Sequence, residues 1–286
     1  MQAPPTIHPV DSDLLPKFCS FLHQHLYSER SVYEWQQALS ENWCEERPNY
    51  GYVLVNEENE IVGGIGALYA DREIGDKKVK ICNITSWCVL EAFRMQSMRL
   101  AMALISQPGE YHYTDFSPTS TVGSVLQFLK FKPLDERVTV LANLPWWQPA
   151  TQVLTKPDDM SKTLSAENLR VYNDHKKYSW LHFLSLQSDN RQCLVIYKIG
   201  TFKGCPAIKV IYLSDSLVFS NGFRSLGSWW LFQHAALSTH VETRLLSKDY
   251  RLSAIREGFV NKVYLSNDLQ AEDIDYIYSE SVVLDL

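Results

Sequence analysis

Residues 51–90 constrain the fold more than any other stretch, because they predict three consecutive β-strands. Their sequence, GYVLVNEENEIVGGIGALYADREIGDKKVKICNITSWCVL, is rich in apolar and β-branched residues and becomes strongly polar only at NEEN and REIGDKK. These two segments have the composition of turns. Strands joined by such short turns pair antiparallel, so the sequence predicts a meander of three strands.

Helices and further strands surround this meander in the first half of the chain. Residues 11–46 carry apolar positions at helical spacing after the capping residues Asp11 and Ser12. The elements expected after the meander are a helix at 93–106, a short strand at 111–117, a helix at 119–130 and a strand at 136–144. Pro108 and Gly109 would end the first of these helices.

The second half of the chain repeats much of this order, which indicates an internal duplication. The elements expected there are a helix at 165–186, a hairpin at 192–215, an apolar helix at 223–238, a strand at 241–247, a helix at 248–259, a strand at 260–266 and an edge strand in the tail at 268–286. Residues 145–163 contain three prolines and no clear periodicity, which is typical of a connector. We therefore predict two modules, at 1–145 and 164–286, joined by a linker at 146–163.

Composition and charge disfavour several classes of protein. With 45% hydrophobic residues the chain can build a core, and its formal net charge of −6 gives no general attraction to nucleic acid or to an anionic membrane. No stretch approaches the roughly 20 apolar residues of a membrane span, and the first residues lack the pattern of a signal peptide. The six cysteines are scattered without a C-x-x-C pair. We therefore expect a cytoplasmic protein with reduced thiols, no metal, no nucleic-acid partner and no membrane partner.

The order of elements in the first half resembles that of the acyl-CoA N-acyltransferases of the GCN5-related (GNAT) superfamily. In that family an Arg/Gln-x-x-Gly-x-Gly/Ala turn follows the fourth strand, after an acidic and an aromatic position. The segment VLEAFRMQSMRLA fits this register. Glu91 and Phe93 take the acidic and aromatic positions, Arg94 takes the leading position, and Ser97 and Arg99 stand where the family has glycines. The resemblance implies an α/β fold with an α+β mixed sheet.

The second half fits the same family separately. The segment GFRSLGSWW places Arg224 and Gly227 at the leading Arg and the first glycine, and IREGF supplies the closing Gly-Phe pair of the family, Gly258 and Phe259. The chain thus resembles two tandem GNAT-like modules. In such pairs often only one module is catalytic, and we favour the first because acidic residues flank its expected reaction centre.

The resemblance implies acetyl-CoA or another acyl-CoA as co-substrate. Amides at the start of a helix near Gln96 would hold the pyrophosphate, with help from arginines, and a backbone N–H of the fourth strand would polarise the thioester carbonyl. The predicted cofactor-binding residues are Trp87, Cys88, Val89, Arg94, Gln96, Ser97, Met98, Arg99, Arg224 and Gly227. The plainer interpretation of Arg94 and Arg99 is two surface arginines. For Gly227 it is a small residue that allows close helix packing, and for Met98 it is packing in the core.

Two carboxylates are the candidate general bases. Glu91 lies at the exit of the fourth strand, and Asp115 lies at the end of the next strand. Glu91 could instead be a solvated turn residue, and Asp115 could cap the next helix. The family often uses a tyrosine to protonate the leaving thiolate, but its two positions in this chain hold Leu126 and Ala254.

These observations predict an N-acyltransferase that transfers an acyl group, acetyl in the simplest case, from CoA to an amine of a small molecule or amino sugar. One alternative is a catalytically inactive GNAT-like binding or regulatory protein, which the missing tyrosine and glycines favour. Another is a Fem-type aminoacyl transferase, which the acidic balance disfavours because such an enzyme needs an aminoacyl-tRNA. The sequence leaves open the acceptor, the acyl length, the module that binds CoA and the oligomeric state.

Overall fold

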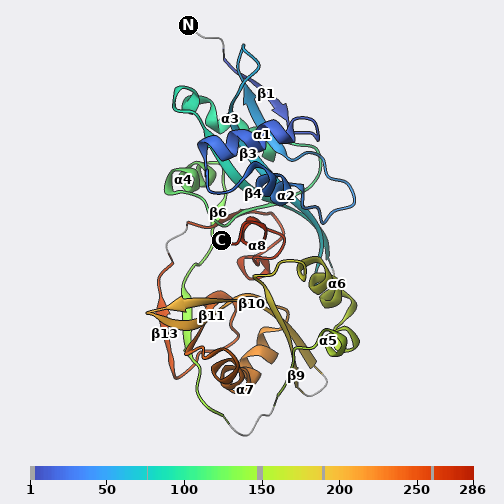
Figure 1. The fold of residues 1–286 in the computed structure, drawn as a ribbon, viewed down its shortest axis with the longest axis vertical. Helices are drawn as coiled ribbons and strands as arrows, with labels where there is room; N and C mark the ends of the chain where they lie inside the picture. Colours follow the sequence, from blue (N-terminus) through green and yellow to red (C-terminus); the bar gives the residue numbers. More distant parts are fainter. Residues whose placement is uncertain (1–3, 76, 147–150, 189–190, 259–260) are drawn as a thin grey trace. The chain divides into compact units, whose positions relative to one another are not determined.

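Two mixed β-sheets of seven strands organise the chain in the computed structural model, which describes residues 4–75, 77–146, 151–188, 191–258 and 261–286 (Figure 1). Each sheet is the centre of one unit. Unit 1 comprises Met1–Leu134, Val260–Leu269 and Tyr278–Leu286, and unit 2 comprises Asp135–Phe259 and Gln270–Ile277. The predicted fold class, two tandem modules each built on an α+β mixed sheet, is confirmed.

The sheet of unit 1 has the strand order β1-β2-β3-β4-β5-β14-β6. Its strands are β1 (Thr6–Pro9), β2 (Gly51–Val55), β3 (Ile61–Ile74), β4 (Lys77–Val89), β5 (His112–Asp115), β14 (Val263–Leu265) and β6 (Lys132–Pro133). The meander predicted at 51–90 is confirmed as β2, β3 and β4, which pair antiparallel. β4 and β5 pair parallel, because a helical crossover lies between them in the chain.

Helices cover both faces of the unit 1 sheet (Figure 1). They are α1 (Leu15–His25), α2 (Val32–Ser40), α3 (Ser97–Ile105), α4 (Ser120–Phe128) and α8 (Glu280–Val283). On one face α1 packs so closely on β3 that a Cβ at Gly64 would lie 2.3 Å from Phe18 Cε2, so this position requires glycine. On the other face Leu104 of α3 and Leu126 of α4 share a core with Ile65 of β3.

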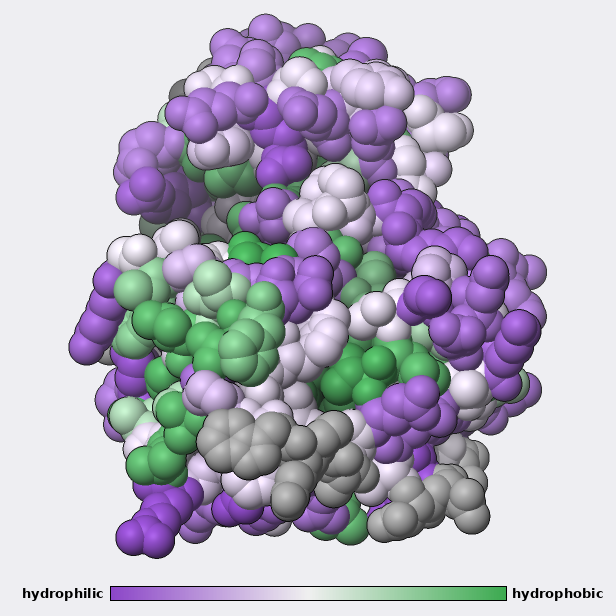
Figure 2. Space-filling model, turned by 60° about the horizontal axis from the view of Figure 1, so that its bottom comes forward, coloured by the Kyte–Doolittle hydropathy of each residue, from purple (hydrophilic) through white to green (hydrophobic). Residues whose placement is uncertain are grey.

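The sheet of unit 2 has the strand order β13-β7-β12-β11-β10-β9-β8. Its strands are β8 (Gln152–Leu154), β9 (His182–Ser188), β10 (Arg191–Phe202), β11 (Cys205–Leu213), β12 (Ser238–Glu242), β7 (Val138–Ala142) and β13 (Ser253–Arg256), and its helices are α5 (Pro157–Thr163), α6 (Ala166–His175) and α7 (Ser216–His234). Phe219, Leu226 and Trp230 of α7 form the core with one face of this sheet. Apolar side chains also reach the surface of unit 2, as the green areas in Figure 2 show.

Each sheet contains one strand that the chain order would assign to the other half. β14 comes after every strand of unit 2 in the sequence but lies between β5 and β6. β7 comes before the other strands of unit 2 and lies between β12 and β13. β7 lies before residue 145 but belongs to the sheet of unit 2, and β14 lies after residue 164 but belongs to the sheet of unit 1. The module limits at 145 and 164 therefore stay a prediction.

Several predicted elements of the second half are wrong. The helix expected at 165–186 ends at His175, and the rest of that stretch forms β9, in which Leu184 and Leu186 alternate toward the core. The helix expected at 248–259 contains β13 instead. The tail at 268–286 is not an edge strand: it contains a 3₁₀ turn, Ala271–Asp273, and α8, and most of it after Asp273 is buried. β1 was not predicted at all.

No helix among the described residues combines the length and the apolar composition that crossing a membrane would require.

Candidate active site in unit 1

The two parallel strands at the centre of unit 1 separate partway along their length. β4 pairs with β5 from Ile81↔His112 to Asn83↔Thr114, and β5 ends at Asp115. β4 continues to Val89 beyond its last pairing with β5. Backbone groups on this edge of β4 therefore face a space that a neighbouring strand would fill in a continuous sheet, and a ligand could pair with them instead.

A β-bulge distorts β4 at the same point. On the other side of β4, Thr85 pairs with Gly66 and Cys88 pairs with Gly64, so Ser86 and Trp87 together oppose Ile65. Ser86 has a φ of +52°, a left-handed conformation that costs a non-glycine residue about 1–2 kcal/mol. The predicted thioester-binding segment, Trp87 to Val89, therefore begins in the bulge.

A cavity of about 450 Å³ opens where the strands separate. Its lining comes from the α1–α2 connection, α2, β4, the end of β5 and the turn after it, the start of α4 and the last residues of the chain: Leu26, Tyr27, Arg30, Trp35, Thr85, Ser86, Trp87, Asp115, Ser117, Pro118, Thr119, Val122, Leu284, Asp285 and Leu286. The Trp87 indole N–H is buried without a hydrogen-bond partner among the described residues. Of the predicted site residues, Trp87 and Asp115 line this cavity.

Asp115 lies beside a second buried carboxyl group, that of Glu280 at the first position of α8. The two residues are 4% and 0% exposed. Both carboxyls are held by the turn that follows β5: Asp115 Oδ1 accepts from the Ser117 N–H at 3.2 Å, and Glu280 Oε1 accepts from the Phe116 N–H at 2.7 Å and from the Ser117 hydroxyl at 3.2 Å. Glu280 Oε2 is buried and has no hydrogen-bond partner among the described residues.

This environment makes both carboxyls weaker acids. Burial, and then the charge of Glu280, raise the pKa of Asp115 well above its ordinary 3.8. Burial raises the pKa of Glu280 from 4.5 to about 7, against the opposing effect of its hydrogen-bond donors. Neither carboxyl forms an ion pair in the described part of the chain. Asp115 does not cap α4, because the N-cap is Thr119.

Glu280 is not among the predicted site residues, because the alternating pattern of the tail predicts an edge strand. The signal was present in YIYSESVVL, where a single acid stands inside an apolar segment. An acid is rarely buried without a specific reason.

The turn expected to hold pyrophosphate has a different form from the one that the resemblance implies. Residues Glu91–Gln96 form a 3₁₀ helix that continues directly into α3. The N–H of Phe93 donates to Leu90 O, and the N–H of Ser97 donates to Arg94 O. These amides are therefore engaged within the helical segment, whereas an anion at a helix start needs free N–H groups.

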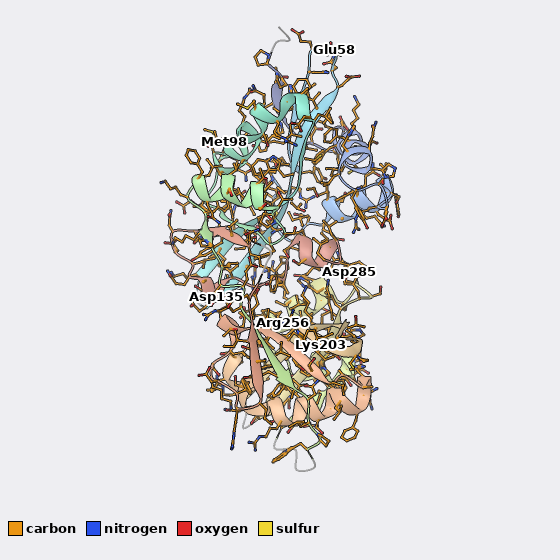
Figure 3. The ribbon with its side chains drawn as sticks, turned by 90° about the vertical axis from the view of Figure 1, so that its left-hand side faces the viewer. Glu58, Met98, Asp135, Lys203, Arg256 and Asp285 are labelled. Atoms are coloured by element: carbon orange, nitrogen blue, oxygen red, sulfur yellow. The ribbon has the colours of Figure 1, made fainter. Side chains whose placement is uncertain are left out.

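The side chains of this segment have partners or face solvent. Arg94 forms an ion pair with Glu91 at 2.5 Å, and both side chains are mostly exposed. Arg99 donates to Pro5 O and to Gln96 Oε1, at 3.0 Å each. Met98 lies at the surface of unit 1 (Figure 3) and is 40% exposed, so core packing is wrong for this residue. None of these five residues lines the cavity.

The corresponding segment of unit 2 lacks a turn at the predicted place. α7 begins at Ser216, so Arg224 and Gly227 lie inside the helix. Arg224 stacks over the Trp146 ring at 4.9 Å, and a Cβ at Gly227 would lie 3.1 Å from Asn143 Oδ1. Both residues thus have packing contacts. The N-terminus of α7 is capped by Asp215, whose Oδ1 accepts from the N–H groups of Leu217 and Val218.

Unit 2 also replaces the acid of unit 1 with an apolar residue. The last parallel pair is Asn83↔Thr114 in unit 1 and Lys209↔His240 in unit 2. The next residue is Asp115 in unit 1 and Val241 in unit 2, and Val241 belongs to the core. The two predicted site residues that line the cavity, Trp87 and Asp115, both belong to the first half.

Known proteins resemble this chain in structure and not in sequence. No family model and no curated protein matches the sequence. Solved structures do match. A GCN5-related N-acetyltransferase from Anabaena variabilis has a TM-score of 0.59 at 9% identity, over 91% of this chain and 71% of that one. A conserved protein of unknown function from Enterococcus faecalis has a TM-score of 0.63 at 8% identity, over 94% and 74%. A GCN5-related glucosamine N-acetyltransferase region of a fungal multi-domain β-N-acetylglucosaminidase has a TM-score of 0.52 at 9% identity, over 92% and 38%.

These matches extend over more than nine-tenths of the chain and therefore include both sheets. The strand separation and the bulge in β4 are features of this chain's own strand pairing. The chain has the fold of the GCN5-related N-acetyltransferases, in a two-module arrangement.

Proposed function

We propose that this protein transfers an acyl group from acyl-CoA to the amine of a small molecule, in the cavity of unit 1. The observation that carries the proposal is the position of Asp115. Its buried carboxyl ends β5 at the point where β4 turns its bulged edge into the cavity. Amine acylation needs a polarised thioester carbonyl and a group that exchanges protons with the amine, and these two features supply both.

The cavity lining favours an organic amine as acceptor. Trp35, Trp87 and Leu26 offer apolar and aromatic surface, whereas Asp115 and Asp285 are acidic. Arg30 is the basic side chain of the lining, and its guanidinium already donates to Leu284 O at 2.8 Å and stacks on Trp35. An amine is thus attracted to the acidic end of the cavity, and its carbon skeleton packs on the aromatic wall. The glucosamine N-acetyltransferase match supports amino sugars as one class to test.

The acyl donor would extend from this cavity along β4. The Trp87 indole N–H, which adjoins the bulge at Ser86 and has no partner among the described residues, is a donor of the kind that a pantetheine and thioester would use. The pyrophosphate would rely on Arg94 more than on backbone amides, because the amides of Phe93 and Ser97 are engaged in the helical segment and Arg94 is exposed. Glu91, which pairs with Arg94, is in this proposal a partner of the arginine and not the base.

Acyl-CoA binding and turnover test the proposal in that order. We expect saturating acetyl-CoA or a longer acyl-CoA to raise the melting temperature, and CoA to be released in the presence of a suitable amine. Arg94→Ala should weaken binding. The matched control is Arg224→Ala, which removes an arginine that stacks on Trp146 in unit 2 and should leave the acyl-CoA Kd unchanged. If no acyl-CoA stabilises the protein, the proposal is wrong.

A second candidate function is binding of an acyl-CoA or a related ligand without turnover. It is favoured by the engaged amides of the turn after β4 and by the Asp215 cap at the corresponding helix of unit 2. The two functions differ in one measurement. Calorimetric binding of acyl-CoA with no CoA release, over a panel of primary amines and amino sugars, would favour the binding protein.

A further inference from the structure

The buried pair of carboxyls has an unequal distribution of hydrogen-bond donors. Glu280 Oε1 accepts from two donors, the Phe116 N–H and the Ser117 hydroxyl, whereas Asp115 Oδ1 accepts from the Ser117 N–H alone. Hydrogen bonds to a carboxylate stabilise its charged form. When two buried carboxyls share one negative charge, that charge therefore resides on the better solvated member, Glu280, and the proton resides on Asp115.

The other charged groups near the pair do not reverse this order. The cavity lining contributes Arg30 from the α1–α2 connection, Asp285 after α8, and the Tyr27 phenol, which donates to Glu29 at 2.7 Å. Arg30 is engaged with Leu284 O and the Trp35 ring. The residues of β4 and α4 in the lining are uncharged. The nearest strong influence on Asp115, apart from its own burial, is thus Glu280.

We propose that Asp115 is protonated in the resting protein while Glu280 carries the negative charge, and that Asp115 gives its proton to the leaving thiolate and recovers one from the attacking amine. This inference rests on the proposed acyltransferase function. The position where a tyrosine was expected holds Leu126, which is fully buried in the core and does not line the cavity, and the one phenol of the cavity lining, that of Tyr27, already donates its proton in a hydrogen bond to Glu29.

Asp115 alone can donate the proton that the sulfur needs and accept the proton that the nitrogen loses. The amine nitrogen forms the new C–N bond as the C–S bond breaks, and the electron pair of the C–S bond leaves with sulfur. Sulfur takes the proton of Asp115. The resulting Asp115 carboxylate lies beside the charged Glu280 and is therefore a strong base, so it removes the surplus proton from the nitrogen. Asp115 is protonated again, and the net change is one proton moved from nitrogen to sulfur.

Glu280 is a positioning residue in this scheme, because it acts through Asp115 and does not touch the reactants. Its substitution by Gln keeps the shape and an acceptor for the Phe116 N–H but removes the charge. We expect Glu280→Gln to lower the pKa of Asp115 by at least about one unit, which is about a tenfold change in its protonation equilibrium. The alkaline limb of the pH–rate profile should move to lower pH by the same amount.

Two measurements on the full chain test the inference. Carboxyl-selective ¹³C NMR of the wild-type protein, without substrates, should show Asp115 protonated at pH 7, and Glu280→Gln should shift that titration downward. The pH–rate profile of the same variant should shift in parallel. The matched control is Glu58→Gln, which removes an exposed carboxylate of unit 1 that does not line the cavity and should move neither titration appreciably.

The outcomes separate the inference from the function on which it rests. If the wild-type protein turns over no acyl-CoA, the proposed function fails, and the NMR titration still decides where the proton resides. If turnover occurs but Asp115 is ionised at pH 7 in the wild-type protein, the inference is overturned. It is also overturned if Glu280→Gln lowers the rate equally at every pH, because that is the result expected of a purely structural residue.

Discussion

The two units share a strand order but differ in what occupies the gap between their central parallel strands. In unit 1 the strands separate after Asn83 and Thr114, and an acid and a cavity follow. In unit 2 they separate after Lys209 and His240, and β11 is likewise bulged, at Ile211. There Val241 continues into an apolar core with α7. The separating strands and the bulge are thus present in both units, whereas the residue after the last parallel pair is a buried acid in unit 1 and a core valine in unit 2.

The comparison shows that the fold supplies separating strands in both units, and that a few side chains determine whether the gap between the strands is polar or apolar. A pair of separating strands leaves backbone groups unpaired in either unit. Filling the gap with apolar side chains stabilises the unit, whereas leaving a cavity with two buried carboxyls destabilises it. The buried carboxyls and the cavity of unit 1 therefore lower its stability, as buried polar groups at binding and catalytic sites commonly do.

The largest effect is expected from removing the acid of unit 1. Asp115→Asn should lower the rate of CoA release by about 10²- to 10⁴-fold, the contribution typical of a positioned proton-exchanging group. The melting temperature should not fall, because the amide replaces a carboxyl whose burial is unfavourable. A steady-state assay with thermal denaturation of the same samples checks both statements. An unchanged rate would show that Asp115 takes no part in the mechanism, and that the acid in unit 1 and the valine in unit 2 do not make the two units functionally different.

Placing an acid at the equivalent position of unit 2 should have the next largest effect. Val241→Asp buries a carboxyl in an apolar core, at a residue that is 1% exposed, and should lower the free energy of unfolding by about 3 kcal/mol at pH 7. Chemical denaturation at pH 7 and pH 5 measures the loss. It should shrink at the lower pH, where the buried acid is neutral. A loss that is small at both pH values would mean that the gap in unit 2 is more open than its apolar lining indicates.

The pH dependence of stability should also distinguish the units. The pKa of Glu280 is raised from 4.5 to about 7, so between these values the folded state binds more protons than the unfolded state. The free energy of unfolding therefore falls as the pH rises from about 4.5 to about 7, by about 3 kcal/mol for this group alone. Its stabilising contribution is fully present below pH 4.5 and lost above pH 7.

Urea denaturation from pH 4 to pH 8 measures this slope. Glu280→Gln should make it less steep without abolishing it, because the pKa of Asp115 is raised as well, whereas Glu257→Gln, which removes an exposed acid from unit 2, should leave it intact. A flat profile in the wild-type protein would contradict the buried, weakly acidic pair.

The sequence predicted the fold better than it predicted the site. The meander at 51–90 and the hairpin at 192–215 were found because strong apolar runs and short polar turns are local signals. The helix expected at 248–259 failed because its apolar residues are too few to show a period, and pairing with β7 decides its conformation. The turn motif misplaced the start of α7 because the capping residue, Asp215, lies outside the motif.

At the site, Asp115 could be identified because it ends a strand, and Trp87 because it precedes the turn. Glu280 could not, since its role depends on contacts with Asn83 and Phe116, which are far away in the sequence. Long-range burial of a polar residue leaves almost no local pattern. The strand exchange of β7 and β14 was hidden for the same reason, because the sequence shows where strands are and not which sheet they join.

The smallest expected effect concerns the helix that follows β11. Asp215→Ala removes the two hydrogen bonds to the N–H groups of Leu217 and Val218 and an ion pair with Arg191 at 2.6 Å, and should cost about 1 kcal/mol of stability. Thr119→Ala, which removes the cap of α4 in unit 1, is the matched control and should cost a similar amount. The freed amides of α7 should not confer acyl-CoA binding, because Val241 still fills the gap beside them. Equilibrium dialysis with labelled acyl-CoA, in an Arg94→Ala background that suppresses binding to unit 1, tests this. Saturable binding gained with Asp215→Ala would show that the helix cap, and not the apolar side chains in the gap, prevents unit 2 from binding acyl-CoA.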